Sequence, residues 1–133
     1  MGQSAIEFRG NISWWSEGDI ELWLFALVRE IEKLPKADDW LADARRLWRK
    51  QFSIGFGHSP DPHLDKICTS NDRIERTIEL AQSALSTLSS NPLFRREELI
   101  QAGVGGDIRW TCDQPATGAI GVGRAFIELL KKA

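Results

Sequence analysis

The sequence predicts a mainly α-helical fold, a single-domain helical bundle of about five helices over residues 1–133, with short strands near residues 5–14 and 107–112. Three observations lead to this prediction. Apolar residues recur at intervals of three and four along most of the chain, which is the spacing of one helical face. Capping residues, glycines and prolines separate these periodic segments. A content of 42% hydrophobic and 27% charged residues is typical of a globular core rather than of disorder.

The first predicted helix, over residues 16–34, is the one around which we expect the others to pack. Ser16 suits the N-cap position, and Pro35 cannot continue a helix. The first half of the helix is apolar nearly all round, so it needs neighbours on two sides. Its apolar residues are Ile20, Leu22, Trp23, Leu24, Phe25, Ala26, Leu27, Val28, Ile31 and Leu34.

Two short alternations of apolar residues lie at 5–14, before this helix, around Arg9, Gly10 and Asn11. They fit a small hairpin, because Gly-Asn is a permitted turn pair. They fit equally an irregular arm packed on the first helix, and the sequence leaves both alternatives open.

A second helix is predicted over residues 40–51, capped by Asp38 or Asp39. The link from the first helix is short, so the two helices should be antiparallel neighbours. A third helical stretch covers 61–88, with Asp61 as N-cap and Pro62 at the first helical position. It should break near 69–72, where Thr, Ser, Asn and Asp disfavour a helix interior.

The last third of the chain predicts two more helices and a short strand. One helix runs over 92–102 with Asn91 as its N-cap, and it ends at Gly103, which suits a left-handed position. The other runs over 119–132. Between them, Ile108, Trp110 and Cys112 alternate, which indicates the strand near 107–112.

The charge balance of the chain argues against a nucleic-acid-binding protein. Seventeen basic residues face nineteen acidic ones, so the net charge of −2 argues against binding nucleic acid through bulk charge. One face of the second predicted helix is basic and would favour binding of nucleic acid; its residues are Arg45, Arg46, Arg49 and Lys50. Basic faces of amphipathic helices are more often simply exposed to solvent.

We expect a cytoplasmic protein without a membrane partner. No apolar run approaches the roughly 20 residues of a membrane span, and the amino-terminal residues lack the pattern of a signal peptide. In that compartment Cys68 and Cys112 should be reduced and buried, although the sequence leaves their pairing open. The oligomeric state is open as well.

Tryptophan usage gives the first functional hypothesis. The chain has six Trp and no Tyr, and Trp14 and Trp15 are adjacent, so they cannot both face inward in regular structure. We expect Trp14 and Trp15, with one of the pair left outside the core, to bind a partner protein together with Phe56 and His58 of the loop at residues 53–61. No catalytic set and no cofactor is indicated. The hypothesis is a non-enzymatic interaction domain, of immunity or adaptor type, that occludes a partner surface.

An alternative hypothesis uses the segment that holds both histidines of the chain. His58, Asp61 and His63 carry the ligand types of zinc and similar cations, which would suit a small metal-dependent enzyme or a ligand-binding protein. Their spacing matches no helical metal motif. Metal content separates the two hypotheses.

Overall fold

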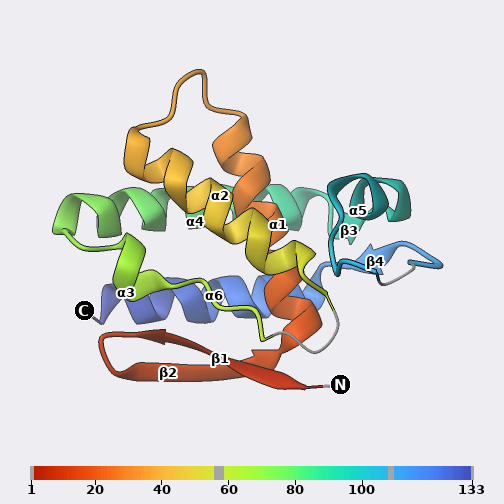
Figure 1. The fold of residues 1–133 in the computed structure, drawn as a ribbon, viewed down its shortest axis with the longest axis horizontal. Coiled ribbons are helices and arrows are strands. Elements are labelled where there is room, and N and C mark those ends of the chain that lie inside the picture. The colour runs from red at the N-terminus through yellow and green to blue at the C-terminus, as the bar shows by residue number, and fades with distance from the viewer. Residues whose placement is uncertain (1, 56–58, 108–109, 133) are drawn as a thin grey trace.

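A computed structural model describes residues 2–55, 59–107 and 110–132 of the chain (Figure 1). Within these ranges the chain forms six helices and two two-stranded antiparallel sheets, which confirms the predicted mainly helical fold. The elements are β1 (Gln3–Phe8), β2 (Asn11–Ser16), α1 (Glu17–Glu32), α2 (Asp39–Ser53), α3 (Leu64–Ile67), α4 (Asn71–Ser90), β3 (Leu93–Phe94), α5 (Arg96–Ala102), β4 (Gln114–Pro115) and α6 (Thr117–Lys131).

Helix α1 lies at the centre, as its all-round apolar character predicts. The Ser16 hydroxyl accepts a hydrogen bond from the Asp19 backbone N–H at 3.2 Å, which is the expected N-cap. The helix contacts α2, α4 and α6, and Trp23, Leu24 and Leu27 are fully buried. Figure 1 shows α1 crossing the middle of the molecule, with α2 returning beside it in the opposite direction.

Helices α4 and α6 pack against each other and against α1. The close approach of α1 and α6 depends on Gly123, because a Cβ there would lie 2.6 Å from the Trp23 ring. The Trp23 ring in turn packs edge-to-face on Phe126, with ring centroids 5.6 Å apart.

Strands β1 and β2 form a hairpin, which decides between the two alternatives left by the sequence. Its two-residue turn is Arg9-Gly10, both with positive φ (49° and 84°), one residue earlier than the Gly-Asn pair. One face of β1 enters the core through Ser4, Ile6 and Phe8.

The predicted helix start at Asp61 is wrong. The Asp61 carboxylate accepts a hydrogen bond from the His63 N–H at 2.8 Å, and His63 has a left-handed φ of 51°, so the chain turns before α3 begins. The predicted break is present, and the Ser70 hydroxyl caps α4 by accepting from the Arg73 N–H.

The helix predicted from residue 92 begins only at Arg96, because Leu93–Phe94 pair with Gln114–Pro115. The strand predicted near 107–112 is displaced: of that range the structure describes 107 and 110–112, which form no strand. There the Trp110 indole donates to the Val104 carbonyl at 2.8 Å, and the Trp110 carbonyl accepts from the Arg96 side chain. Gly103 ends α5 with a φ of 72°, as predicted.

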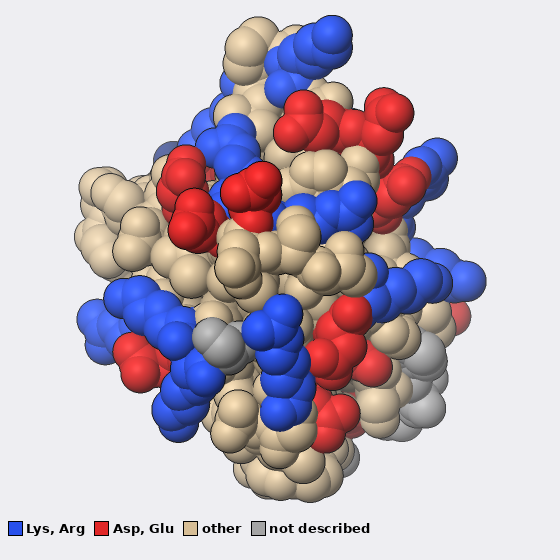
Figure 2. Space-filling view, turned by 90° about the vertical axis from the view of Figure 1, so that its left-hand side faces the viewer, with Lys and Arg blue, Asp and Glu red and all other residues tan. Residues whose placement is uncertain are grey.

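Acidic partners neutralise most of the basic face of α2. Arg45 and Arg49 lie 3.8 and 3.1 Å from the Glu32 carboxylate of α1, and Arg46 pairs with Asp43. Figure 2 shows basic and acidic side chains interspersed over one face of the molecule, without a continuous patch of one sign. A solvated, ion-paired surface accounts for this helix face.

Neither cysteine forms a disulfide. Cys68 is buried, as predicted, and its thiol donates to the Thr77 hydroxyl at 3.4 Å, whereas Cys112 is exposed, contrary to the prediction. Burial raises the pKa of the Cys68 thiol, which disfavours the reactive thiolate. None of the helices formed by the described residues has the length and apolar character that crossing a membrane requires.

Candidate functional site

The two adjacent tryptophans of β2 point in opposite directions. Trp15 is partly buried against the core, and a Cβ on Gly121 of α6 would lie 2.9 Å from its ring. Its indole N–H donates to the Ser13 hydroxyl at 2.8 Å. Trp14 lies on the outer face of the hairpin with 63% of its surface exposed. Of the pair, Trp14 is therefore the side chain available to a partner.

Trp14 belongs to a small outer patch of the hairpin. Ile12, two residues earlier on the same strand, is 51% exposed. Across the strand pair, Ala5 lies opposite Trp14 and Glu7 lies opposite Ile12, so all four occupy one face. We call these four residues, Ala5, Glu7, Ile12 and Trp14, the hairpin patch.

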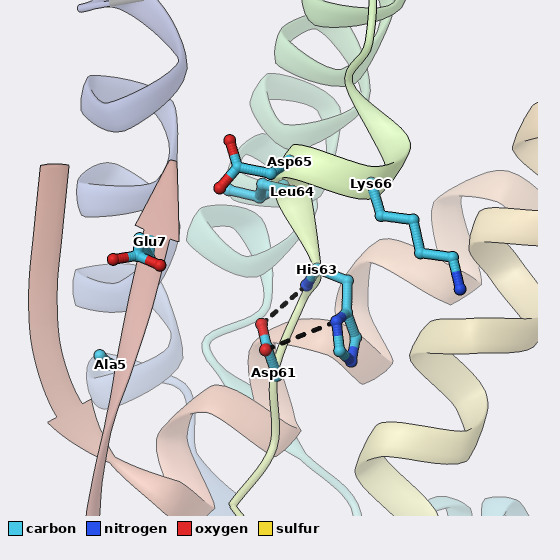
Figure 3. Close-up of a pocket in the computed structure, with 7 residues that line it drawn as sticks. All are labelled: Ala5, Glu7, Asp61, His63, Leu64, Asp65 and Lys66. Carbon is cyan, nitrogen blue, oxygen red and sulfur yellow. Dashed lines mark hydrogen bonds and ion pairs between the residues drawn. The ribbon is translucent and has the colours of Figure 1, made fainter. Parts of the chain in front are cut away.

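A pocket of about 310 Å³ adjoins the hairpin patch (Figure 3). Ala5 and Glu7 of β1 form one wall, and residues 61–66 form the other. Figure 3 shows the carboxylates of Asp61 and Asp65 extending toward the β1 side of this segment, while the His63 ring and the Lys66 side chain extend to the opposite side. With Glu7 on the facing strand, the pocket is acidic.

The 61–66 wall is held in place by hydrogen bonds to α2 and to the hairpin. The Trp48 indole of α2 donates to the Pro62 carbonyl at 2.8 Å, and the Gln51 side chain accepts from the Asp61 N–H at 3.0 Å. At the turn of the hairpin, the Arg9 N–H donates to the Asp65 carboxylate at 3.0 Å and closes that end. The pocket is therefore bounded by anchored backbone on both sides.

Two members of the predicted metal set are adjacent. The His63 Nδ1 lies 3.5 Å from an Asp61 carboxylate oxygen. His58, the third member, lies outside the described residues, as does Phe56 of the predicted partner surface. Among residues 2–55, 59–107 and 110–132, no three His, Cys, Asp or Glu side chains gather as a metal site would require. Asp61 and His63 alone supply two side chains, which is fewer than a coordination shell needs.

A second apolar surface lies at the other end of the molecule. Ile100 of α5 is 49% exposed and lines a pocket of about 280 Å³ with Arg96 and the partly buried Trp110. The Trp110 indole and the Arg96 guanidinium are both bound to backbone carbonyls within this segment. Its polar groups therefore serve local structure.

Glu21 is an ionisable group in the core that the sequence did not single out. It lies on α1 and is only 8% exposed. Burial, with a smaller contribution from the negative charge of Glu17, raises the pKa of Glu21 to about 7 from its ordinary value of 4.5. This carboxyl therefore titrates near neutral pH.

The sequence identified Trp14 of the hairpin patch and Asp61 and His63 of the pocket wall, but it missed Ala5, Glu7 and Ile12. Ile12 could have been found once the hairpin was assumed, because it shares the alternation with Trp14. Glu7 carries no sequence signal, because it reaches the pocket only through the packing of β1 on α3. No protein-family model, curated protein or solved structure matches the chain.

Proposed function

We propose that the chain is a non-enzymatic protein-interaction domain, of immunity or adaptor type, that acts by occluding a surface of a partner protein. The exposure of Trp14 carries the proposal. An indole left 63% exposed beside Ile12 contributes little to the core, while tryptophan is among the residues that most often dominate binding energy.

The acidic pocket next to the hairpin patch supports a partner surface of opposite charge. Glu7, Asp61 and Asp65 outnumber the cationic Lys66 around it. A partner that places an apolar side chain against Trp14 and a basic one near Glu7 would be complementary in both respects. The bound chain would cover the basic surface of the partner, and other molecules could then no longer reach that surface.

The proposed compartment is the cytoplasm. The two thiols, Cys68 and Cys112, are unpaired, which suits a reducing environment.

The proposal is tested by capture with matched variants. The tagged chain, its Trp14→Ala variant and its Ile100→Ala variant are each used to capture proteins from a cell extract, and the affinity of any captured protein is then measured. Ile100 is a suitable control because it is a comparably exposed apolar residue, on α5. We expect Trp14→Ala to weaken binding by more than about tenfold and Ile100→Ala to leave it within about twofold.

Two results of this capture experiment would contradict the proposal. It is wrong if no captured protein depends on Trp14, or if the Ile100 variant loses the partner and the Trp14 variant keeps it. Phe56 and His58 stay predicted members of the same surface, and their variants enter the same assay.

The alternative, a metal-dependent enzyme or ligand-binding protein using His58, Asp61 and His63, has its own test. The favourable observation is the contact of the Asp61 and His63 side chains beside a pocket. Elemental analysis of the purified chain and its thermal midpoint with and without Zn²⁺ decide it. A stoichiometric metal whose stabilisation is lost in His63→Ala supports the alternative, and no bound metal with no shift of the midpoint removes it.

A further inference from the structure

The edge of β1 that faces the pocket exposes backbone groups able to pair with another strand. In an antiparallel pair, alternate residues direct both N–H and C=O toward the partner strand, and the residues between them direct both groups away. The register of the hairpin determines which residues of β1 are of each kind.

Two observations fix this alternation. A two-residue turn is flanked by a hydrogen-bonded pair, which here is Phe8 and Asn11. At the other end of the hairpin, the Glu17 N–H donates to the Gly2 carbonyl at 3.2 Å. Gly2 and Phe8 are an even number of residues apart along the chain, so every second residue between them also bonds to β2. Ser4, Ile6 and Phe8 therefore bind β2, whereas Ala5 and Glu7 direct their N–H and C=O groups away from it.

The hydrogen bond of Arg9 shows where these outward groups point. The Arg9 N–H, next in the same alternation after Glu7, donates to Asp65 on the opposite wall of the pocket. The outward N–H and C=O groups of Ala5 and Glu7 thus lie on the side of residues 61–66, and both residues line the pocket. Among the described residues, no hydrogen-bond partner satisfies these four backbone groups.

We infer that the pocket receives an extended peptide segment of the partner, which adds to the edge of β1 as a third strand and carries Lys or Arg. This inference rests on the proposed function and specifies the chemistry of its partner. Strand addition supplies main-chain hydrogen bonds from Ala5 and Glu7, and alternate side chains of the added strand supply specificity. The added segment ends beside Glu7, because the Arg9–Asp65 hydrogen bond closes the groove there.

Charge complementarity selects the basic segment. The side chains of Glu7, Asp61 and Asp65 surround the place where the added strand would lie, and Asp65 already uses one oxygen for Arg9. Every second residue of a strand shares one face, so basic residues at alternating positions would meet these carboxylates together. An acidic segment would instead meet like charges.

The test uses the intact ¹⁵N-labelled chain and two synthetic peptides. One peptide alternates Lys and Val over seven residues, and its matched control alternates Glu and Val. Amide exchange and chemical shifts are followed by NMR at 150 mM salt. We expect the Lys peptide to slow exchange of the Ala5 and Glu7 amides by more than about tenfold. The Ser4 and Ile6 amides, which already bind β2, should be protected with and without peptide.

Two variants complete the test. Glu7→Lys should weaken binding of the Lys peptide by more than about tenfold by reversing a charge. Ala5→Pro removes an outward N–H and leaves the ladder to β2 intact, and it should abolish the protection. Circular dichroism checks that both variants fold. If Ala5→Pro does not fold, the exchange measurement on the unaltered chain and the Glu7→Lys variant still test the inference.

The inference is overturned by several results. These are unchanged exchange of the Ala5 and Glu7 amides with the Lys peptide, equal binding of the Glu peptide, or binding unaffected by Glu7→Lys. Its failure is distinguishable from that of the proposed function. A captured protein that depends on Trp14 but not on Glu7 would retain the interaction domain and reject strand addition.

Discussion

Replacing Gly123 by alanine tests the contact on which the centre of the fold depends. The added methyl group would lie 2.6 Å from a ring carbon of Trp23 and 2.8 Å from a methyl carbon of Leu85. Trp23 is fully buried and is held edge-to-face by Phe126, so its ring has little room to move. The helices α1 and α6 would have to separate to admit the methyl group.

The expected size of the effect follows from two opposing contributions. Alanine is about 1 kcal/mol more favourable than glycine in a helix interior. Forcing an extra methyl group into a well-packed core costs about 1–3 kcal/mol. Because the two nearest atoms are both below 3 Å, the larger cost applies, and we expect a net loss of about 1–2 kcal/mol at Gly123.

Gly18 provides the matched control. It lies in the first turn of α1, and a Cβ there would meet no atom within 4 Å. Gly18→Ala should therefore leave stability unchanged or raise it by up to about 1 kcal/mol. The free energy of unfolding in urea, followed by circular dichroism, measures both variants. If Gly123→Ala proves as stable as the unaltered chain, the close approach of α1 and α6 through this residue is incorrect.

Two further predictions concern Glu21 and the tryptophan pair. The pKa of Glu21 is raised to about 7 in the folded chain from 4.5, so the folded state binds its proton more tightly, and stability should fall as the pH rises from about 4.5 to 7. Glu21→Gln should remove that fall and stabilise the chain at pH 8 by about 1–3 kcal/mol; urea unfolding at pH 5 and pH 8 measures this, and an unchanged pH profile would contradict it. Trp15→Ala should cost about 2–3 kcal/mol because its ring packs on the core, whereas Trp14→Ala should change stability by less than about 0.5 kcal/mol. Thermal unfolding of both variants measures this difference, and equal losses would contradict it.

The sequence predicted the elements whose signals are local. Apolar spacing and the Ser16 cap identified α1, and its all-round apolar character identified its central position, because both depend on residues within one segment. The break before α4 and the left-handed Gly103 were also found from local capping chemistry.

The errors occurred where distant residues decide the local structure. Asp61 is a good N-cap residue by type, but the Gln51 side chain and the Trp48 indole of α2 bind the Asp61 N–H and the Pro62 carbonyl, and no helix begins there. The helix predicted from residue 92 loses its first turn because Leu93–Phe94 pair with Gln114–Pro115, about 20 residues later. Tertiary hydrogen bonds of this kind override the propensity of a segment.

The candidate site is also formed by residues that are distant in the sequence, so composition and local patterns could not predict it. Its walls are β1 and residues 61–66, which come together because Phe8 and Leu64 are buried in one core and because the Arg9 N–H binds Asp65. The hairpin then leaves outward backbone groups on the pocket side and Trp14 on its exposed face. In the proposed interaction, the strand edge facing anchored acidic residues would pair with a basic strand while Trp14 would pack against apolar side chains of the partner. Main-chain pairing, charge and aromatic contact would thus act on one partner together, which favours this end of the molecule over the locally satisfied surface around Trp110.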